Sequence, residues 1–291
     1  MKTIGPGAAL GGFLSALTLA WGLDALALQP PAAGAWYWVA RQQGLYLTGV
    51  WSIGLMALIM LLALRPAWLE QPLGGMDKIY RLHKWAGILA VAAAAAHWLL
   101  KLASGPLKTL ADAANRPARD AVLALFDGSR GVAKDLGEWS IYLLLAMLVL
   151  TLWRRFPYRA WRLFHRAMPV LFLVLAFHTA ALAPARYWSG PVGLLLVPLL
   201  AAGAYAALVA LLGRVGHGRL AQGRIVSLAQ QPGGIMQVCC ELDGNWQAHR
   251  AGQFAFVTFD RREGAHPFTI ASAPVPGERR VTFQIKALGD Y

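Results

Sequence analysis

The pattern of apolar residues divides the chain into a membrane-spanning part and a shorter β-rich part. Six apolar segments are predicted as helices that cross a hydrocarbon core of about 30 Å; they run roughly over 8–28, 45–64, 82–102, 139–153, 163–182 and 191–212. The fourth is short, but Trp139 and Trp153 at its ends are typical of interface anchors. After Arg214, apolar and polar residues alternate in runs near 223–227, 235–239, 253–259 and 280–286, which is typical of antiparallel strands.

The sequence therefore predicts an α-helical membrane protein, with a six-helix bundle over residues 1–213 and an antiparallel β domain over 214–291. The β part is small for a domain, and the chain stops at Tyr291 just after a predicted strand. We therefore interpret this part as the beginning of a larger domain. The first apolar segment has features of a secretory signal, but it is longer than most signal cores and five spans follow it. We interpret it as an uncleaved first helix.

Composition supports an integral membrane protein. The chain is 57% hydrophobic and only 14% charged, whereas soluble domains carry about 25% charged residues. The net charge of +13 would suggest a nucleic-acid partner in a soluble chain. Here the basic residues flank apolar segments, so membrane topology accounts for them and we expect membrane lipid, not nucleic acid, as their partner.

The distribution of basic residues predicts the orientation in the membrane. The connection between the fourth and fifth segments carries Arg154, Arg155, Arg159 and Arg162. The turn between the fifth and sixth segments has only Arg186. By alternation, Lys2, Arg65, Lys78, Arg81, Lys84 and Arg214 fall on the same side as the arginine-rich connection. The positive-inside rule makes that side cytoplasmic, with both termini there, and we expect a bacterial inner membrane.

Four histidines in the apolar segments are the main candidates for chemistry. His83, His97, His165 and His178 are the only histidines in the first 216 residues, and they form two pairs 14 and 13 residues apart. A rise of 1.5 Å per residue separates the two levels by about 20 Å, most of a hydrocarbon core. A single membrane histidine is most simply a hydrogen-bonded packing residue, but four at near-matching intervals favour axial ligation of two haems. Because a CxxCH attachment motif is absent, the haems would be held non-covalently, as haem b.

Helical geometry predicts how these histidines pair. Fourteen residues leave His83 and His97 about 40° apart on one helix face, whereas thirteen leave His165 and His178 about 140° apart on an ideal helix. Pro169 lies between the latter two and removes a backbone hydrogen bond, so we predict a kink near it. His83 would then meet His165 at the cytoplasmic level, and His97 would meet His178 at the outer level. A straight fifth helix would contradict two haems.

Basic residues surround the expected inner pair. Arg81, Lys84, Arg162 and Arg166 are candidates to neutralise haem propionates, although contact with lipid headgroups explains each of them equally well. If all four histidines bind iron, both haems are six-coordinate and have no open site. Full ligation favours outer-sphere transfer of single electrons over binding of oxygen at the metal.

The β-rich part carries a second motif. It contains HPFT at His266, Pro267, Phe268 and Thr269, preceded by Gly252 and Phe254 and followed by Ser272, Lys286 and Gly289. Together with the histidine spacing, this motif resembles the ferric reductase and NADPH oxidase superfamily of transmembrane flavocytochromes, most closely the compact bacterial members. The resemblance implies a β-barrel of the ferredoxin-reductase type that binds FAD.

The resemblance also implies roles for these residues. Phe268 would pack on the isoalloxazine ring, Thr269 would contact its reactive edge, and His266 would lie near the phosphate or ribose. Lys286 and Gly289 would approach the diphosphate, where a glycine permits close backbone contact. The candidate flavin residues are thus His266, Pro267, Phe268, Thr269, Ser272, Lys286 and Gly289. Members of the superfamily continue into a nicotinamide-binding lobe, but this sequence contains no Gly-rich strand–helix turn for one. NAD(P)H would therefore bind to a missing lobe or a separate reductase.

These observations predict transmembrane electron transfer from cytoplasmic NAD(P)H, through FAD and two b-type haems, to oxygen or a ferric chelate outside. One alternative is a haem-bearing cytochrome b subunit that is fed by quinol or by a partner reductase. Such a subunit would have no use for the HPFT strand. A second alternative is a non-enzymatic membrane scaffold with incidental histidines. Cys239 and Cys240 are adjacent on a strand and point to opposite faces, so we expect two reduced thiols.

Overall fold

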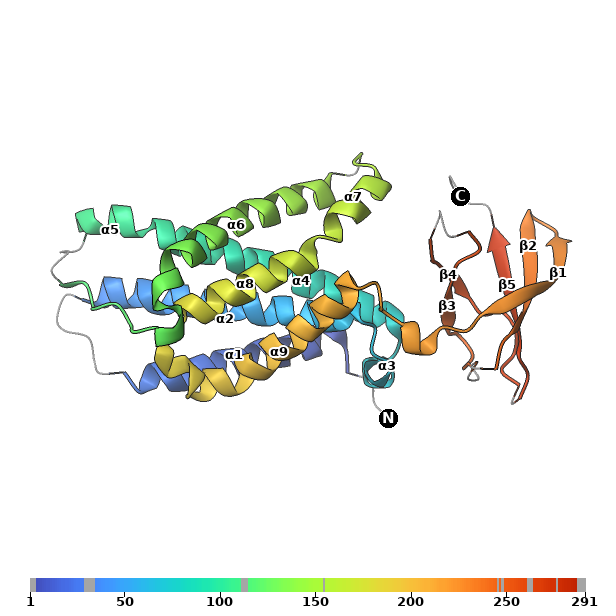
Figure 1. Ribbon diagram of the computed structural model, residues 1–291, viewed down its shortest axis with the longest axis horizontal. Helices are drawn as coiled ribbons and strands as arrows, with labels where there is room; N and C mark the ends of the chain where they lie inside the picture. Colours follow the sequence, from blue (N-terminus) through green and yellow to red (C-terminus); the bar gives the residue numbers. More distant parts are fainter. Residues whose placement is uncertain are drawn as a thin grey trace. The chain divides into compact units, whose positions relative to one another are not determined.

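The helical and β-rich parts form two compact units, Met1–Val215 and Gly216–Tyr291. A computed structural model describes residues 4–28, 35–110, 115–153, 155–244, 246, 249–260, 264–275 and 277–286. In the first unit, the longer helices are α1 (Pro6–Leu26), α2 (Trp36–Ala63), α4 (Met76–Leu102), α6 (Arg130–Leu152), α7 (Tyr158–His165), α8 (Met168–Leu182) and α9 (Pro191–Leu211). Short helices α3 (Ala67–Leu73) and α5 (Ser104–Leu110) flank α4 (Figure 1).

Six helical segments in the described residues are long and apolar enough to cross a membrane, as predicted. All but the last begin earlier than the apolar pattern indicates, and two begin nine residues earlier. The second begins at Trp36 and includes the polar residues Arg41 and Gln42, and α6 begins at Arg130, ahead of Trp139. Helices keep their backbone hydrogen bonds beyond the hydrocarbon core, so charged residues in the last turns do not end them. Trp139 and Trp153 are exposed, as interface anchors should be.

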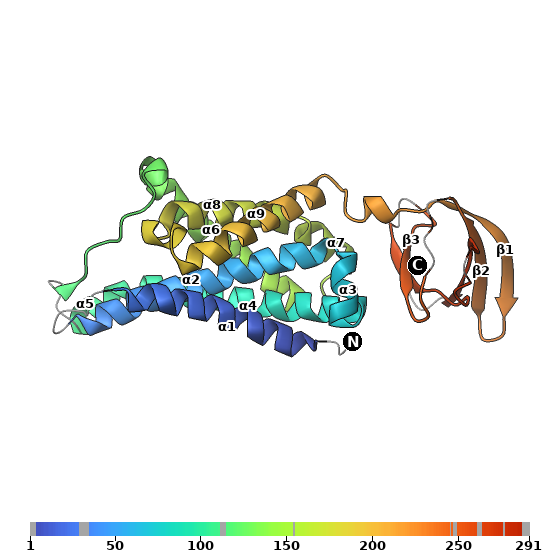
Figure 2. The same cartoon turned by 90° about the horizontal axis from the view of Figure 1, so that it is seen from below.

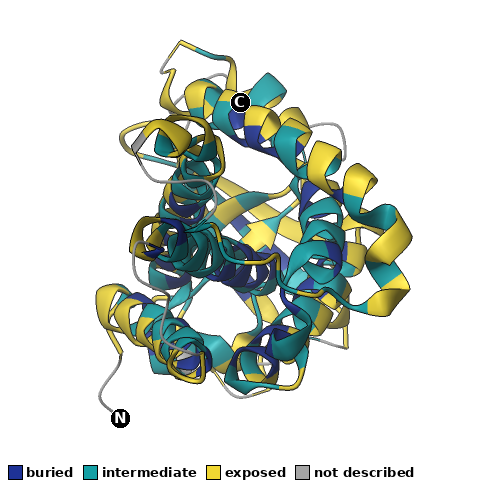
Figure 3. Ribbon diagram, turned by 90° about the vertical axis from the view of Figure 1, so that its left-hand side faces the viewer, coloured by how far each residue is buried: buried dark blue, intermediate teal, exposed yellow. Residues whose placement is uncertain are grey.

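Helix α2 is the centre of the bundle. Half of its apolar window is buried, compared with 11–22% for the other five spans. It packs against α1, α4, α8 and α9, while α6 packs against α4, α7 and α8 (Figures 1 and 2). Buried positions face the interior of the bundle and exposed positions lie along its outside (Figure 3). The outer surfaces of five spans are therefore available to lipid.

The first helix is part of this core. Leu17 of α1 is only 1% exposed. Near the other end of the helix, buried Asp24 accepts a hydrogen bond of 3.0 Å from the backbone N–H of Val192, at the start of α9. This carboxylate satisfies one of the N–H groups that a helix start leaves without an intrahelical partner. Helix α1 therefore contributes both apolar and polar contacts to the bundle, and its retention stays a prediction.

The fifth span is interrupted where a kink is predicted. Helix α7 ends at His165 and α8 begins at Met168, with Arg166 and Ala167 between them. Pro169 has no N–H, and its ring would clash with the carbonyl four residues earlier, which is that of His165. The predicted break near Pro169 is thus confirmed, and it falls directly after the histidine.

The second unit is antiparallel throughout. Strands β1 (Gly223–Gln231), β2 (Ile235–Leu242) and β5 (Arg280–Lys286) form one sheet in the order β1-β2-β5, and β3 (Phe254–Val257) pairs with β4 (His266–Thr269) in another. A bridge between Ile270 and Phe283 links the two pieces. Gly233 and Gly234 make the β1–β2 turn with φ angles of 81° and 71°, a conformation that favours glycine. The antiparallel prediction is confirmed; the barrel type stays a prediction.

Candidate functional site

The structure brings the four membrane histidines together in the two predicted pairs. The ring centres of His83 and His165 are 6.3 Å apart, and those of His97 and His178 are 6.4 Å apart. Two imidazoles that share one metal ion, each through a bond of about 2 Å, have ring centres roughly 6 Å apart. Both pairs therefore have the separation that two axial ligands of one iron require. Their role as iron ligands stays a prediction.

Both rings of the His97–His178 pair are oriented by backbone carbonyl groups. Nδ1 of His97 lies 2.8 Å from the carbonyl oxygen of Leu45, and Nδ1 of His178 lies 2.6 Å from that of Ala133. A carbonyl oxygen only accepts, so each Nδ1 carries the proton. Each Nε2 is then the unprotonated nitrogen, which is the form that binds a metal.

The His83–His165 pair is supported differently on its two sides. The His83 ring lies near the backbone of Ile59 on the central helix α2. His165 stacks on Trp161 of its own helix, with ring centres 4.7 Å apart and planes 14° from parallel. The position of His165 therefore depends on the conformation of the short helix α7.

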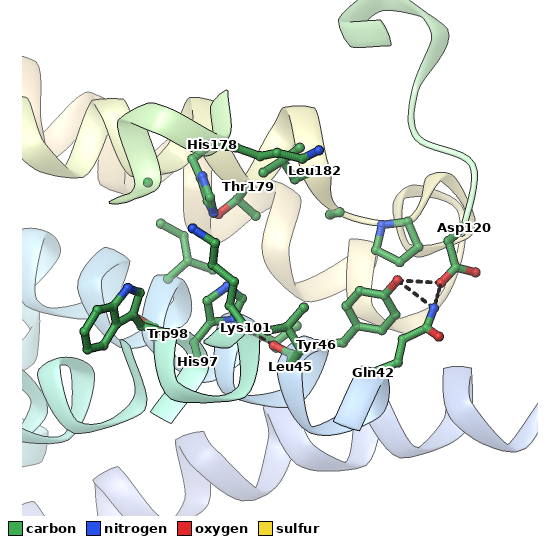
Figure 4. Close-up of a pocket in the computed structure, with 18 of the residues that line it drawn as sticks. Gln42, Leu45, Tyr46, His97, Trp98, Lys101, Asp120, His178, Thr179 and Leu182 are labelled. Atoms are coloured by element: carbon green, nitrogen blue, oxygen red, sulfur yellow. Dashed lines mark hydrogen bonds between the residues drawn. The ribbon is translucent and has the colours of Figure 1, made fainter. Parts of the chain in front are cut away.

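The His97–His178 pair lies in a cavity of about 390 Å³ between α2, α4, α6 and α8 (Figure 4). Its wall near the rings is apolar and includes Val50, Ile53, Ala94, Leu144 and Leu175. Helices α4 and α8 carry the two histidines and face each other across this space. An apolar cavity between two imidazoles suits a flat, mostly apolar macrocycle such as haem.

Polar and basic side chains gather at the mouth of this cavity. Its lining includes Arg41, Lys101, Arg116, Arg119, Arg130 and Lys134. Lys101 pairs with Glu138 at 2.5 Å, and Asp120 accepts hydrogen bonds from Gln42 at 2.7 Å and Tyr46 at 2.5 Å (Figure 4). The mouth thus carries a net positive charge, which favours an anionic group inside it.

Three donors that line the cavity are buried without a partner in the described part of the chain. They are Arg41 Nε, Trp98 Nε1 and the hydroxyl group of Tyr187, a residue that is 2% exposed. Burial raises the pKa of the Tyr187 hydroxyl group, which keeps it a protonated donor. Buried donors normally have acceptors. The carboxylate groups of the haem propionates would be such acceptors. The cavity therefore fits haem in three respects: the two imidazole rings, the apolar wall and the buried donors.

The HPFT residues lie on β4 of the second unit. Pro267 and Thr269 are exposed, whereas His266 and Phe268 are half-buried. The Phe268 ring lies near Phe259 and Phe283, with ring centres 5.8 and 6.3 Å away. Part of its surface therefore packs in the β core, and the exposed Thr269 hydroxyl group is the more accessible group for a flavin.

The remaining predicted flavin residues lie apart along the chain. Two hydrogen bonds hold Ser272. Its backbone carbonyl accepts one from His249 Nε2 at 2.9 Å. Its hydroxyl group accepts one from the backbone N–H of Thr282 at 3.2 Å. Lys286 is exposed at the end of β5. Gly289 lies outside the described residues. Thr269 and Lys286 are thus accessible on β4 and β5, and the flavin roles of all these residues stay predictions.

Residues 48–176 match the family model of the ferric reductase like transmembrane component. This part of the membrane domain is therefore similar to that component. The matched stretch contains His83, His97 and His165, and it ends two residues before His178. No curated protein matches the chain. The match indicates an integral membrane oxidoreductase that moves electrons across the membrane.

The predicted basic residues of the membrane domain lie at the end that carries His83 and His165. Arg81, Lys84 and Arg166 are exposed, and Arg162 is half-buried. The Lys84 ammonium group lies 5.9 Å from the Trp85 ring centre. Their contact with propionates stays a prediction, and lipid headgroups fit the exposed residues equally well.

Sequence reasoning missed most of the groups around the two histidine pairs. The missed groups are the basic lining of the mouth, the Leu45 and Ala133 carbonyls, Trp161 beside His165, and Gly49 and Gly137 beside the rings of His97 and His178. Basic residues at the ends of the second, third and fourth spans were visible signals. The carbonyl groups left no signal, because every residue has one and only packing selects which is used.

Proposed function

We propose that this chain carries single electrons across the membrane, from FAD on the cytoplasmic side to an acceptor on the outside. His83 and His165 would hold the inner b-type haem, and His97 and His178 the outer one. One observation carries the proposal. A single helix, α4, presents two imidazoles at different depths, and each faces a partner at nearly the same ring separation, 6.3 and 6.4 Å.

A haem with two imidazole ligands takes up and releases one electron at the iron without an open coordination site. The protein's own contribution is to hold the four imidazoles, to exclude water from the apolar wall, and to place positive charge at the mouth. Arg41 and Tyr187 would donate to the outer propionates. Water exclusion strengthens these charge interactions, because the local dielectric constant is low.

The electron count sets the stoichiometry. Reduced nicotinamide would deliver two electrons as a hydride to FAD, and these would leave one at a time. Two acceptor molecules are then reduced for each NAD(P)H: two oxygen molecules to superoxide, or two ferric chelates to the ferrous state. His266, Pro267, Phe268, Thr269, Ser272, Lys286 and Gly289 would contact FAD. The nicotinamide would bind to a further lobe or to a separate reductase.

The test is a reduced-minus-oxidised absorption spectrum with haem and FAD contents per chain, measured on the protein and on two variants. His97→Ala should lose one of two haems, because it removes an axial ligand. His217→Ala removes an exposed histidine outside the spans and should keep both haems.

An unchanged haem content in His97→Ala would contradict the proposed ligand. Two haems with no flavin would instead favour a cytochrome b subunit that is fed by quinol or by a partner reductase. A preparation without a reducible haem spectrum would favour a scaffold. Superoxide and ferric-chelate assays with the electron donor present would separate the two acceptors.

A further inference from the structure

Each ring of the His97–His178 pair lies directly over a glycine of a neighbouring helix. A Cβ atom on Gly49 of α2 would be 3.2 Å from both Nδ1 and Cε1 of His97. A Cβ atom on Gly137 of α6 would overlap the same two ring atoms of His178. Two different pairs of helices thus bring the same edge of an imidazole onto a glycine.

Each glycine also lies four residues after the carbonyl group that orients the ring. Gly49 follows Leu45, and Gly137 follows Ala133; these two carbonyls accept from Nδ1 of His97 and His178. In an α-helix, the carbonyl oxygen of residue i already accepts from the N–H of residue i+4. A side chain at i+4 tilts towards the helix N-terminus and covers that oxygen. A glycine leaves the oxygen's second lone pair accessible.

We propose that Gly49 and Gly137 are positioning residues, which admit the imidazoles of His97 and His178 to the Leu45 and Ala133 carbonyls. The resulting hydrogen bonds hold the proton on Nδ1 and present Nε2 to the iron of the outer haem. This inference rests on the proposed function, since it assigns the geometry of one of the two haems.

The hydrogen bonds also affect the iron. A carbonyl partner on Nδ1 makes an imidazole a more basic ligand. A more basic ligand stabilises the ferric state and lowers the reduction potential. The two glycines therefore tune the outer haem, and their loss should shift its potential upwards. The haem proposed at His83 and His165 lies at the other depth of the bundle, so its reduction potential should not change.

The experiment compares Gly137→Ala and Gly49→Ala with the unmodified protein. The readouts are haem content, the midpoint potential of each haem from redox titration, and the low-spin electron paramagnetic resonance signals, which report imidazole orientation. Because an alanine at position 137 overlaps the ring, we expect haem affinity at that site to fall about 10–100-fold. At position 49 the contact is 3.2 Å, so we expect both haems to remain, with a raised potential and an altered resonance signal for the outer one.

Matched glycines on the same helices control for crowding alone. In Gly44→Ala the new atom would also be 3.2 Å from its nearest neighbour, but that neighbour is a Leu100 methyl group. Gly54→Ala crowds Leu17 at 2.7 Å, and Gly131→Ala on α6 meets nothing within 4 Å. All three controls should keep the potential and resonance signal of the outer haem. The unaltered inner haem signal shows in every sample that the bundle has folded.

The outcomes separate this inference from the proposed function. Unmodified protein without two low-spin haems would contradict both. Two such haems, with Gly137→Ala and Gly49→Ala indistinguishable from the three controls, would overturn only the glycine assignment. Equal changes in the inner and outer haems would also overturn it, because a general loosening of the bundle would then explain the result.

Discussion

A histidine that holds iron has to present one ring nitrogen and keep the other occupied, and the protein meets this need with backbone groups. His97 and His178 each use a carbonyl of an adjacent helix. A backbone partner adds no charge to the bundle interior, where an unpaired charge is costly. At the residue scale, the chain thus fixes its candidate ligands at little electrostatic cost.

The two adjacent cysteines give a residue-scale prediction in the second unit. Cys240 is buried in the β core, whereas Cys239 is partly exposed. Burial raises the pKa of the Cys240 thiol, and the neighbouring Cys239 adds to the effect. Because the thiolate is the reactive form, we expect a soluble alkylating reagent at pH 8 to modify Cys239 first. Mass spectrometry of timed samples measures both rates.

Single variants assign the two rates. Cys239→Ser should remove the fast phase, and Cys240→Ser should leave it. Raising the pH should speed the slow phase, since a thiol with a raised pKa gains thiolate only at higher pH. Equal rates for both cysteines would show that Cys240 is not in the core.

At the element scale, the break in the fifth span decides whether His165 and His178 can each reach a partner on α4. An unbroken helix would place His165 and His178 about 140° apart, yet each contacts its partner on α4 at a ring separation of 6.3 or 6.4 Å. The break at Arg166 and Ala167 lets α7 and α8 adopt separate directions. The element boundary is therefore part of the candidate site.

Replacing the proline near this break should weaken the inner pair. In Pro169→Ala, residue 169 regains an N–H that can bond to the His165 carbonyl, which favours a continuous helix. His165 would then turn away from His83, so we expect loss of inner haem or a changed inner haem potential. Redox titration with haem quantification measures both.

Pro198 of α9 offers a matched control. It lies inside a transmembrane helix that stays continuous, so Pro198→Ala should leave both haems unchanged. An effect of Pro169→Ala on the outer haem alone would contradict this account of the break.

At the scale of the whole molecule, one buried helix organises the membrane domain. Helix α2 is in contact with α1, α4, α8 and α9, and it supplies Leu45, Gly49 and Ile59 to the two histidine pairs. Both candidate sites therefore depend on the same element. A change in the packing of α2 should therefore affect both histidine pairs.

The proposed direction of electron flow requires a defined orientation. In a chain made cysteine-free by Cys239→Ser and Cys240→Ser, Gly128→Cys should react with a membrane-impermeant thiol reagent in intact cells. Ser227→Cys should react only after permeabilisation, because positive charges keep the arginine-rich side in the cytoplasm. Both positions are exposed in the structure, so access depends on the side of the membrane. Reversed labelling would reverse the proposed direction.

Apolar segments and histidine spacing alone predicted much of this protein. The six spans follow from hydropathy, because only a helix satisfies its own backbone in lipid. The antiparallel strands follow from alternation, and the pairing of His83 with His165 and of His97 with His178 follows from their near-matching intervals. Helix ends were predicted less well, as Trp36 and Arg130 show, because polar residues continue a helix beyond the hydrocarbon core.

The tertiary structure decided what local patterns leave open. Pro169 lies next to a break and Pro198 lies inside a continuous helix, although each removes the same hydrogen bond. Likewise, the chain has 30 glycines, and only packing shows that Gly49 and Gly137 lie under imidazole rings. The sequence by itself determined which groups are available. Contacts between distant segments determined which of them meet, since these contacts depend on how whole helices pack.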